Sequence, residues 1–168
     1  RILRIESSSI GFTSNFTIYD SSDSKSLIKS IVKEMQLDDK VYKPGMIQSR
    51  ISNAKNRLIL PDAYAADGNI FRSDMDAKVP ATRDIYRRYW ERCKQSDAMD
   101  FDDLLVYTYL LFKDYPSIRD KYVSQFHYVL VDEYQDTNFA QHSIVLQLTQ
   151  ERQRVCVVGD DAQSIYSF

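Results

Sequence analysis

Two short apolar runs that each stop abruptly at acidic residues constrain the fold of this chain more than any other feature. The first, residues 129–131, precedes Asp132 and Glu133, and the second, residues 155–158, precedes a Gly-Asp-Asp sequence. A run of this kind is typical of a buried parallel strand whose carboxyl end faces a ligand. The two runs therefore predict neighbouring strands with acidic residues at the same edge of a sheet.

The segment between the two runs has the pattern of a helix, which predicts a β-α-β unit. We expect strands at residues 128–131 and 154–158 and a helix at residues 138–149. Such a unit places its strands parallel, with a right-handed crossover. Two parallel strands do not make a stable sheet alone, so we expect the other strands of the sheet to lie outside this sequence.

The first 120 residues have helical periodicity, apart from residues 12–19, which alternate weakly and are predicted to be extended. Apolar residues at helical spacing from 27 to 35 indicate one amphipathic helix, with an N-cap among residues 21–24. The polar residues 68–79 are predicted to be irregular. The other helices that we expect are residues 1–8, as the end of a helix that starts upstream, and residues 44–56, 61–66, 80–95, 100–113 and 116–124.

Three carboxylates, Asp100, Asp102 and Asp103, lie at the start of one of these helices. Asp100 is a good N-cap, and carboxylates in a first turn are stabilised by the helix dipole. This structural role explains all three residues, so we do not interpret them as catalytic.

Composition excludes several classes of protein. No apolar run approaches the length of a membrane span, and the first residues have neither a start Met nor a signal-peptide pattern. Cys93 and Cys156 are predicted to be buried thiols in a reducing compartment, and His127 and His142 are too isolated for a zinc site. These features predict a cytoplasmic protein without a membrane partner.

The net charge of −2 does not by itself indicate a nucleic-acid-binding protein. The basic residues are nevertheless clustered. Residues 43–61 contain four basic and no acidic residues, and residues 83–94 contain five basic residues and two acidic ones. A solvated helix face explains either cluster taken alone.

The acidic residues after the first strand suit nucleotide chemistry. Asp132 can bind Mg²⁺, which keeps several waters and uses only one or two carboxylates, and Glu133 can orient or deprotonate an attacking water. An alternative is that the acidic pair merely caps the helix at Asn138. Asp136 or Thr137 can provide that cap, which weakens the alternative.

Two longer motifs indicate a family. Asp-Glu-Tyr-Gln-Asp-Thr-Asn, residues 132–138, closely resembles the Walker B motif of UvrD/Rep/PcrA-type (superfamily 1) DNA helicases. Gly-Asp-Asp-Ala-Gln-Ser-Ile-Tyr, residues 159–166, resembles the next helicase motif of that family. Residues 16–20, 51–56 and 99–104 are similar to its inserted helical subdomain and to the return of the chain into the motor core, so the resemblance covers essentially the whole chain.

The resemblance implies roles around ATP and Mg²⁺. Asp132 would coordinate the Mg²⁺ of Mg-ATP, and Glu133 would be the catalytic base. Gln163 would contact the γ-phosphate and report its presence to the DNA site. Gln135 and Asp136 would link the nucleotide site to neighbouring motifs.

The resemblance also implies contacts with DNA. Tyr166 would lie along single-stranded DNA, where an aromatic ring stacks on any base. Phe168 occupies a place where relatives usually carry Trp, and it would be a smaller stacking ring. Lys55 and Arg57 would meet the DNA backbone.

One departure from the family pattern is decisive for activity. The sequence contains no Gly-x-x-x-x-Gly-Lys-Ser/Thr, so the loop that cradles phosphates, the Walker A motif, is missing. In the family this loop lies upstream, and the arginines that complete the ATP site belong to a second RecA-like domain downstream. We therefore expect an internal fragment of a helicase that does not hydrolyse ATP by itself.

Taken together, the sequence predicts a predominantly helical α/β chain. Residues 1–19 would border the motor core, residues 20–120 would form the inserted helical subdomain, and residues 121–168 would form an incomplete RecA-like P-loop NTPase piece. The parent would use ATP to translocate on single-stranded DNA and to unwind duplex DNA, in the 3′ to 5′ direction, in repair, replication or recombination. Its second RecA-like domain would be a partner of this piece.

Two other functions stay open. One is the helicase subunit of a helicase-nuclease recombination complex. The other is a helical module that binds DNA or protein without catalysis, against which the intact Asp132, Glu133 and Gln163 argue. We also expect the strand at residues 155–158 to have an unpaired edge through which the fragment self-associates.

Overall fold

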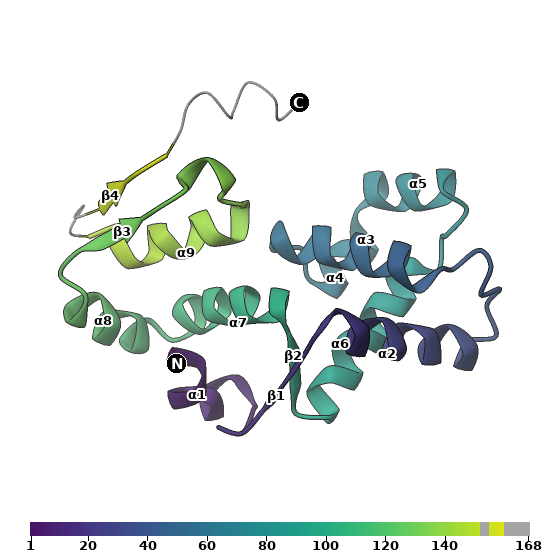
Figure 1. Cartoon of the computed structure of the whole chain (residues 1–168), viewed down its shortest axis with the longest axis horizontal. Helices are drawn as coiled ribbons and strands as arrows, with labels where there is room; N and C mark the ends of the chain where they lie inside the picture. Colours follow the sequence, from purple (N-terminus) through teal and green to yellow (C-terminus); the bar gives the residue numbers. More distant parts are fainter. Residues whose placement is uncertain (152–154, 160–168) are drawn as a thin grey trace. The chain divides into compact units, whose positions relative to one another are not determined.

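The computed structural model of the chain describes residues 1–151 and 155–159. These fall into two compact units, residues 1–104 and residues 105 onward, with the boundary inside helix α7 (Phe101–Asp114). Within the described residues each unit contains a two-stranded parallel sheet (Figure 1). The chain is therefore predominantly helical with small parallel sheets, as the sequence predicts.

The first unit is built mainly from helices. Its elements before α7 are α1 (Ile2–Ile5), the 3₁₀ turn η1 (Ser7–Ile10), β1 (Thr17–Tyr19), α2 (Ser21–Glu34), α3 (Pro44–Asn56), α4 (Pro61–Ala66), α5 (Gly68–Asp76), α6 (Thr82–Gln95) and β2 (Ala98–Asp100). Helices α3 and α4 begin with proline at their first position, where its missing N–H has no intrahelical partner to lose.

Local capping fixes two further helix starts that the sequence analysis placed differently. Helix α2 is capped by Asp20, whose carboxylate accepts the Asp23 N–H at 2.8 Å, so its N-cap precedes the predicted residues 21–24. Residues 68–79 are largely helical and not irregular, because Asp67 accepts the N–H groups of Asn69 and Ile70 and caps α5.

The core of the first unit lies between α2, α3, α4 and α6. One face of each helix contributes apolar side chains, and burying each of them contributes about 1.5–3 kcal/mol. The fully buried members include Ile28, Ile31, Ile47, Val79, Ile85 and Tyr86. Trp90 packs against this cluster from the same face of α6 as Tyr86.

Strands β1 and β2 pair in parallel, with Thr17 opposite Ala98 and Tyr19 opposite Asp100. Strand β2 was not predicted, because three residues are too few to reveal a periodicity and the helical pattern of α7 begins directly after them. Because of this pairing, Asp100 is both the last residue of a buried strand and the residue that precedes α7.

The second unit contains the predicted β-α-β unit. After α7 come α8 (Pro116–Gln125), β3 (Val129–Val131), the 3₁₀ turn η2 (Tyr134–Asp136), α9 (Phe139–Thr149) and β4 (Val155–Val157). Strands β3 and β4 are parallel, with Val129 opposite Val155. The cap of α9 is Asn138 itself, which forms a reciprocal capping box with Gln141. Neither Asp136 nor Thr137 has that role, and Asp132 and Glu133 do not cap the helix.

The β3–β4 pair leaves apolar side chains exposed. Leu130 is 70% exposed and Val157 46% exposed. Among the described residues β4 pairs with β3 alone, and β1 pairs with β2 instead of covering the β4 edge. Self-association through this edge stays a prediction.

The two cysteines differ in their surroundings. Cys93 is buried, and burial raises the pKa of its thiol to about 12, which makes it chemically inert. Cys156 is exposed, so the prediction that it is buried is wrong: it lies on the two-stranded pair that is open to solvent.

In residues 1–151 and 155–159, no helix has the length and apolar character needed to cross a bilayer.

Candidate functional site

The acidic turn after β3, residues 132–136, is the candidate site that the sequence predicts. Asp132 and Glu133 are both exposed, directly beyond the carboxyl end of the strand. Glu133 adopts a left-handed backbone conformation, with φ 51° and ψ 43°. That conformation is uncommon for a residue with a side chain. Its N–H donates to the Asp132 carboxylate at 2.9 Å, which ties the two acidic residues together.

Backbone hydrogen bonds hold this turn against the end of β4. The Tyr134 N–H donates to the carbonyl of Val158 at 3.0 Å, and the Val158 N–H donates to the carbonyl of Val131 at 2.8 Å. A β-carbon placed on Gly159 would lie 2.7 Å from the Gln135 side-chain oxygen. A larger residue at position 159 would therefore displace the Gln135 side chain from its present position.

Gln135 and Asp136 complete the turn. The Gln135 side-chain amide donates to the Glu133 carboxylate, and the Asp136 N–H donates to the Glu133 carbonyl at 3.0 Å. Gln135 thus restrains the carboxylate of Glu133, whose role as a base stays a prediction from the family resemblance. The coupling of Gln135 and Asp136 to other motifs stays a prediction.

The donor set of the turn fits Mg²⁺. Asp132 supplies exposed carboxylate oxygens, and no cluster of three or more His, Cys, Asp or Glu residues suited to a metal occurs in residues 1–151 and 155–159. Mg²⁺ bound with a nucleotide uses one or two carboxylates and takes its other oxygens from phosphate and water. The predicted site residues Gln163, Tyr166 and Phe168 lie outside the described residues.

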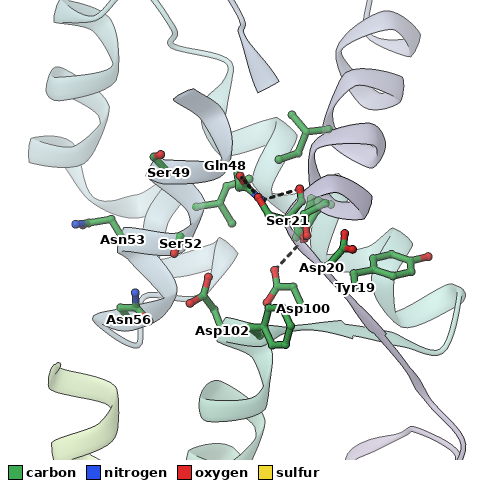
Figure 2. Close-up of a pocket in the computed structure, with 15 residues that line it drawn as sticks. Tyr19, Asp20, Ser21, Gln48, Ser49, Ser52, Asn53, Asn56, Asp100 and Asp102 are labelled. Carbon is green, nitrogen blue, oxygen red and sulfur yellow. Dashed lines mark hydrogen bonds between the residues drawn. The ribbon is translucent and has the colours of Figure 1, made fainter. Parts of the chain in front are cut away.

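The first unit contains a polar cavity of about 470 Å³. Figure 2 shows residues of α3 on one side of it, the β1–α2 junction on the other and the start of α7 below. Gln48 donates to the Ser21 carbonyl at 3.2 Å and accepts from the Ser21 hydroxyl at 3.4 Å, which joins α3 to α2. Hydroxyl, amide and carboxylate groups line it, from Ser49, Ser52, Asn53, Asn56, Asp20, Asp100 and Asp102.

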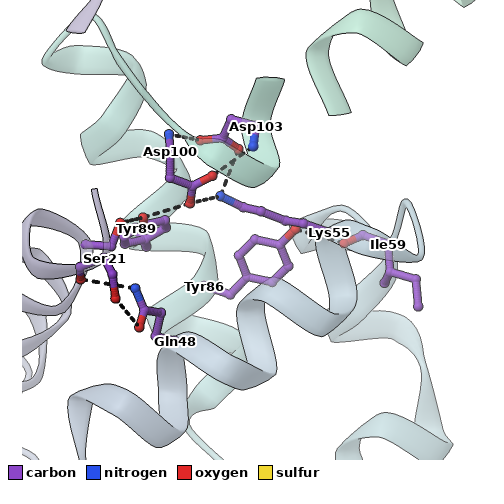
Figure 3. Close-up of polar contacts among 9 residues, drawn as sticks. Ser21, Gln48, Lys55, Ile59, Tyr86, Tyr89, Asp100 and Asp103 are labelled. Atoms are coloured by element: carbon purple, nitrogen blue, oxygen red, sulfur yellow. Dashed lines mark hydrogen bonds and ion pairs between the residues drawn. The ribbon is translucent and has the colours of Figure 1, made fainter. Parts of the chain in front are cut away.

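Lys55 is buried, and the expectation that it meets the DNA backbone is therefore wrong. It is 1% exposed, and its ammonium lies 2.7 Å from Asp100 and 2.8 Å from Asp103 (Figure 3). A contact with phosphate requires an exposed cation, whereas both carboxylates of this ion-pair cluster face Lys55 inside the protein. Arg57, two residues on, is exposed.

The ion-pair cluster of Lys55, Asp100 and Asp103 connects α3 to the start of α7. Asp100 and Asp103 accept each other's backbone N–H, at 2.8 and 3.0 Å, so the predicted N-cap at Asp100 is confirmed and extended to a capping box. The Tyr89 hydroxyl also donates to Asp100 at 2.8 Å. One feature of the sequence predicts the burial of Lys55: it follows Ile51 by four residues, which places both residues on the buried face of α3.

Burial and charge act in opposite directions on these groups. Burial alone would lower the pKa of Lys55, but the two carboxylates raise it above its ordinary value. Burial raises the pKa of Asp103 to about 6. Burial alone would also raise the pKa of Asp100, but the attraction of its carboxylate by Lys55 lowers this pKa below its usual range. Attraction by Lys55 therefore outweighs burial at Asp100, whereas burial outweighs this attraction at Asp103.

Comparison with known proteins gives a consistent result. The whole chain, residues 1–168, matches the family model of the UvrD/REP helicase N-terminal domain. Over its full length the chain is 42% identical to a protein of Staphylococcus epidermidis named ATP-dependent DNA helicase PcrA, and 41% identical to a protein of Staphylococcus aureus with the same name. The chain spans 22% of the length of these curated relatives.

Replacing Lys55 by Met should destabilise the chain strongly. The change leaves Asp100 and Asp103 buried without a cation, which costs about 3–5 kcal/mol of unfolding free energy. Urea unfolding followed by the fluorescence of Trp90, the single tryptophan, measures this loss. Lys29→Met, at an exposed position on α2, is the matched control and should change stability by less than about 0.5 kcal/mol. Equal stabilities of the two variants would contradict the role of the cluster.

The raised pKa of Asp103 predicts a pH dependence of stability. The folded pKa of about 6 exceeds the unfolded value of about 3.9, so the folded state binds the proton more tightly. The stability that this proton contributes is present below about pH 4 and is lost as the pH rises through 6. The unfolding free energy of the wild type, relative to that of Asp103→Asn, should therefore fall between pH 4 and pH 7.

Urea unfolding at a series of pH values measures this difference. Asp39→Asn, in the exposed loop after α2, controls for the loss of one carboxylate. A difference between wild type and Asp103→Asn that rises with pH would contradict the assignment.

Proposed function

The chain belongs to the UvrD/REP helicase family, and we propose that it is part of an ATP-dependent motor that translocates on single-stranded DNA and unwinds duplex DNA. The observation that carries the proposal is the acidic turn at the carboxyl ends of β3 and β4. Asp132 and Glu133 are exposed there, and the turn is restrained by Val158 and Gln135. Carboxylates at such a strand end are suited to a metal-bound nucleotide.

Within this proposal the two acids have different roles. Asp132 holds Mg²⁺, which when bound with ATP neutralises charge on the phosphates. Glu133 accepts a proton from the attacking water as general base. The hydrogen bond from the Gln135 amide to the Glu133 carboxylate supports the separate role of this acid, because it restrains the side chain. Gln163 contacts the γ-phosphate and relays its presence to the DNA.

DNA is the proposed polymeric partner. Tyr166 and Phe168 stack on bases without reading their identity, and the exposed Arg57 contacts backbone phosphate. Movement runs 3′ to 5′, and the parent acts in repair, replication or recombination. The relatives' printed name, ATP-dependent DNA helicase, supports the choice of DNA and ATP.

In the proposed organisation, other segments of the parent protein supply the remaining parts of the ATP site. Residues 20–120 form the inserted helical subdomain, and residues 121–168 form part of a RecA-like domain, bordered by residues 1–19. The phosphate-cradling loop and a second RecA-like domain of the same parent complete the site. The lack of a Gly-x-x-x-x-Gly-Lys-Ser/Thr sequence in the chain supports this division.

Glu133→Gln in the full-length parent tests the proposed base. The amide keeps the shape of the side chain but cannot take up a proton, so DNA-stimulated ATP hydrolysis should fall by about 100-fold or more. Binding of Mg-ATP, measured with a fluorescent analogue, should be retained. Glu34→Gln, on the exposed face of α2, is the matched control with normal turnover. Normal turnover of Glu133→Gln would remove Glu133 from this role.

The chain of 168 residues alone should not hydrolyse ATP. It lacks the loop that cradles phosphates, so Asp132 and Glu133 have no positioned nucleotide to act on. Release of inorganic phosphate from Mg-ATP, with and without single-stranded DNA, measures this directly. DNA-stimulated turnover that is lost on Glu133→Gln would show that the chain holds a complete site and would overturn the proposed division.

A further inference from the structure

A side-chain contact joins the acidic turn to the helix that follows it. The Tyr134 hydroxyl and the His142 Nδ1 lie 2.9 Å apart, and the two rings meet edge to face with centroids 6.0 Å apart. Both residues are half-buried and line a cavity of about 260 Å³ beside the N-terminus of α9. Tyr134 is the residue directly after Glu133, so this contact lies next to the proposed base.

Tyr134 is held along its backbone as well as through its ring. Its N–H donates to the Val158 carbonyl at 3.0 Å, and its carbonyl accepts the Thr137 N–H at 3.0 Å. Glu133, one residue earlier, has the left-handed backbone that persists only where the surroundings enforce it. The hydrogen bonds of Tyr134 therefore fix the residue that directly follows Glu133.

His142 approaches Tyr134 from a fixed support. The capping box of Asn138 and Gln141 defines the first turn of α9, and Ala140 in that turn is fully buried. The His142 N–H donates to the Asn138 carbonyl at 3.0 Å. A side chain on a rigid helix holds its partner more precisely than one on a loop.

We propose that His142 is a positioning residue for Glu133 and that it acts through the hydroxyl of Tyr134. This inference rests on the proposed function, since it gives His142 a role in ATP hydrolysis. Among the described residues, the hydrogen bonds of Asp132 and Glu133 do not involve His142, so its effect passes through Tyr134. A purely structural contact would change stability and leave the turnover of the folded enzyme intact.

The test uses the DNA-stimulated ATPase of the full-length parent. His142→Phe keeps an aromatic ring and removes the Nδ1, and it should lower kcat by about 3- to 10-fold while KM for ATP changes by less than about twofold. His142→Asn places an amide oxygen near the position of Nδ1 and should restore kcat to within about twofold of wild type. His127→Phe, at the other, exposed histidine, is the matched control and should leave kcat unchanged.

A double-mutant cycle shows whether the effect passes through Tyr134. Tyr134→Phe removes the hydroxyl alone and should reproduce the loss seen with His142→Phe. The double variant should lose no more than either single variant, because both remove one contact. If the melting temperature shows that His142→Phe does not fold, the kcat of Tyr134→Phe tests the proposal instead.

The outcomes separate this inference from the proposed function. Wild-type kcat in folded His142→Phe or Tyr134→Phe, equal losses in His142→Phe and His142→Asn, or additive losses in the double variant would each overturn the role of His142 alone. A wild-type parent without ATP hydrolysis would overturn the proposed function, and the inference with it.

Discussion

The ion pairs between Lys55 and the carboxylates of Asp100 and Asp103 are the interaction on which the first unit depends. A buried cation is tolerated only where its charge is matched and its protons have acceptors. The charge is matched, because the ammonium lies within 2.8 Å of both carboxylates, and Asp100 accepts a hydrogen bond from it. The same two carboxylates form the capping box of α7. The end of β2, the start of α7 and the C-terminal turn of α3 are consequently fixed by the same few atoms.

The acidic turn depends on a different constraint, the close contact of two strand ends. Backbone hydrogen bonds join Tyr134 to Val158 and Val158 to Val131, and Gly159 leaves room for Gln135. The acids themselves are solvent-exposed and need no burial to be held. The hydrogen bonds of the turn, rather than burial of its carboxylates, therefore fix the backbone on which Asp132 and Glu133 lie.

Elements with strong local signals could be predicted from the sequence. Proline located the starts of α3 and α4, and apolar runs followed by acids located β3 and β4. The features that were missed depend on contacts between distant residues. Strand β2 forms because β1 pairs with it, and Lys55 is buried because Asp100 and Asp103 form ion pairs with it. By composition Lys55 belongs to a basic segment. Its spacing from Ile51 places it on the buried face of α3, but the two acids that pair with it lie 45 and 48 residues further along the chain, so the sequence does not identify them.

The parallel pairing of β1 and β2 has a consequence for how the chain tolerates change. All of α2 to α6 is contained between two neighbouring strands, so these helices leave the sheet and return to it at the same place. The entropy of closing such a loop grows only with the logarithm of its length. Insertions or deletions in its exposed connections, such as residues 38–41, should therefore have little effect on the strand pairing. The exposed connections between these helices are thus free to vary in length while the two strands keep their register.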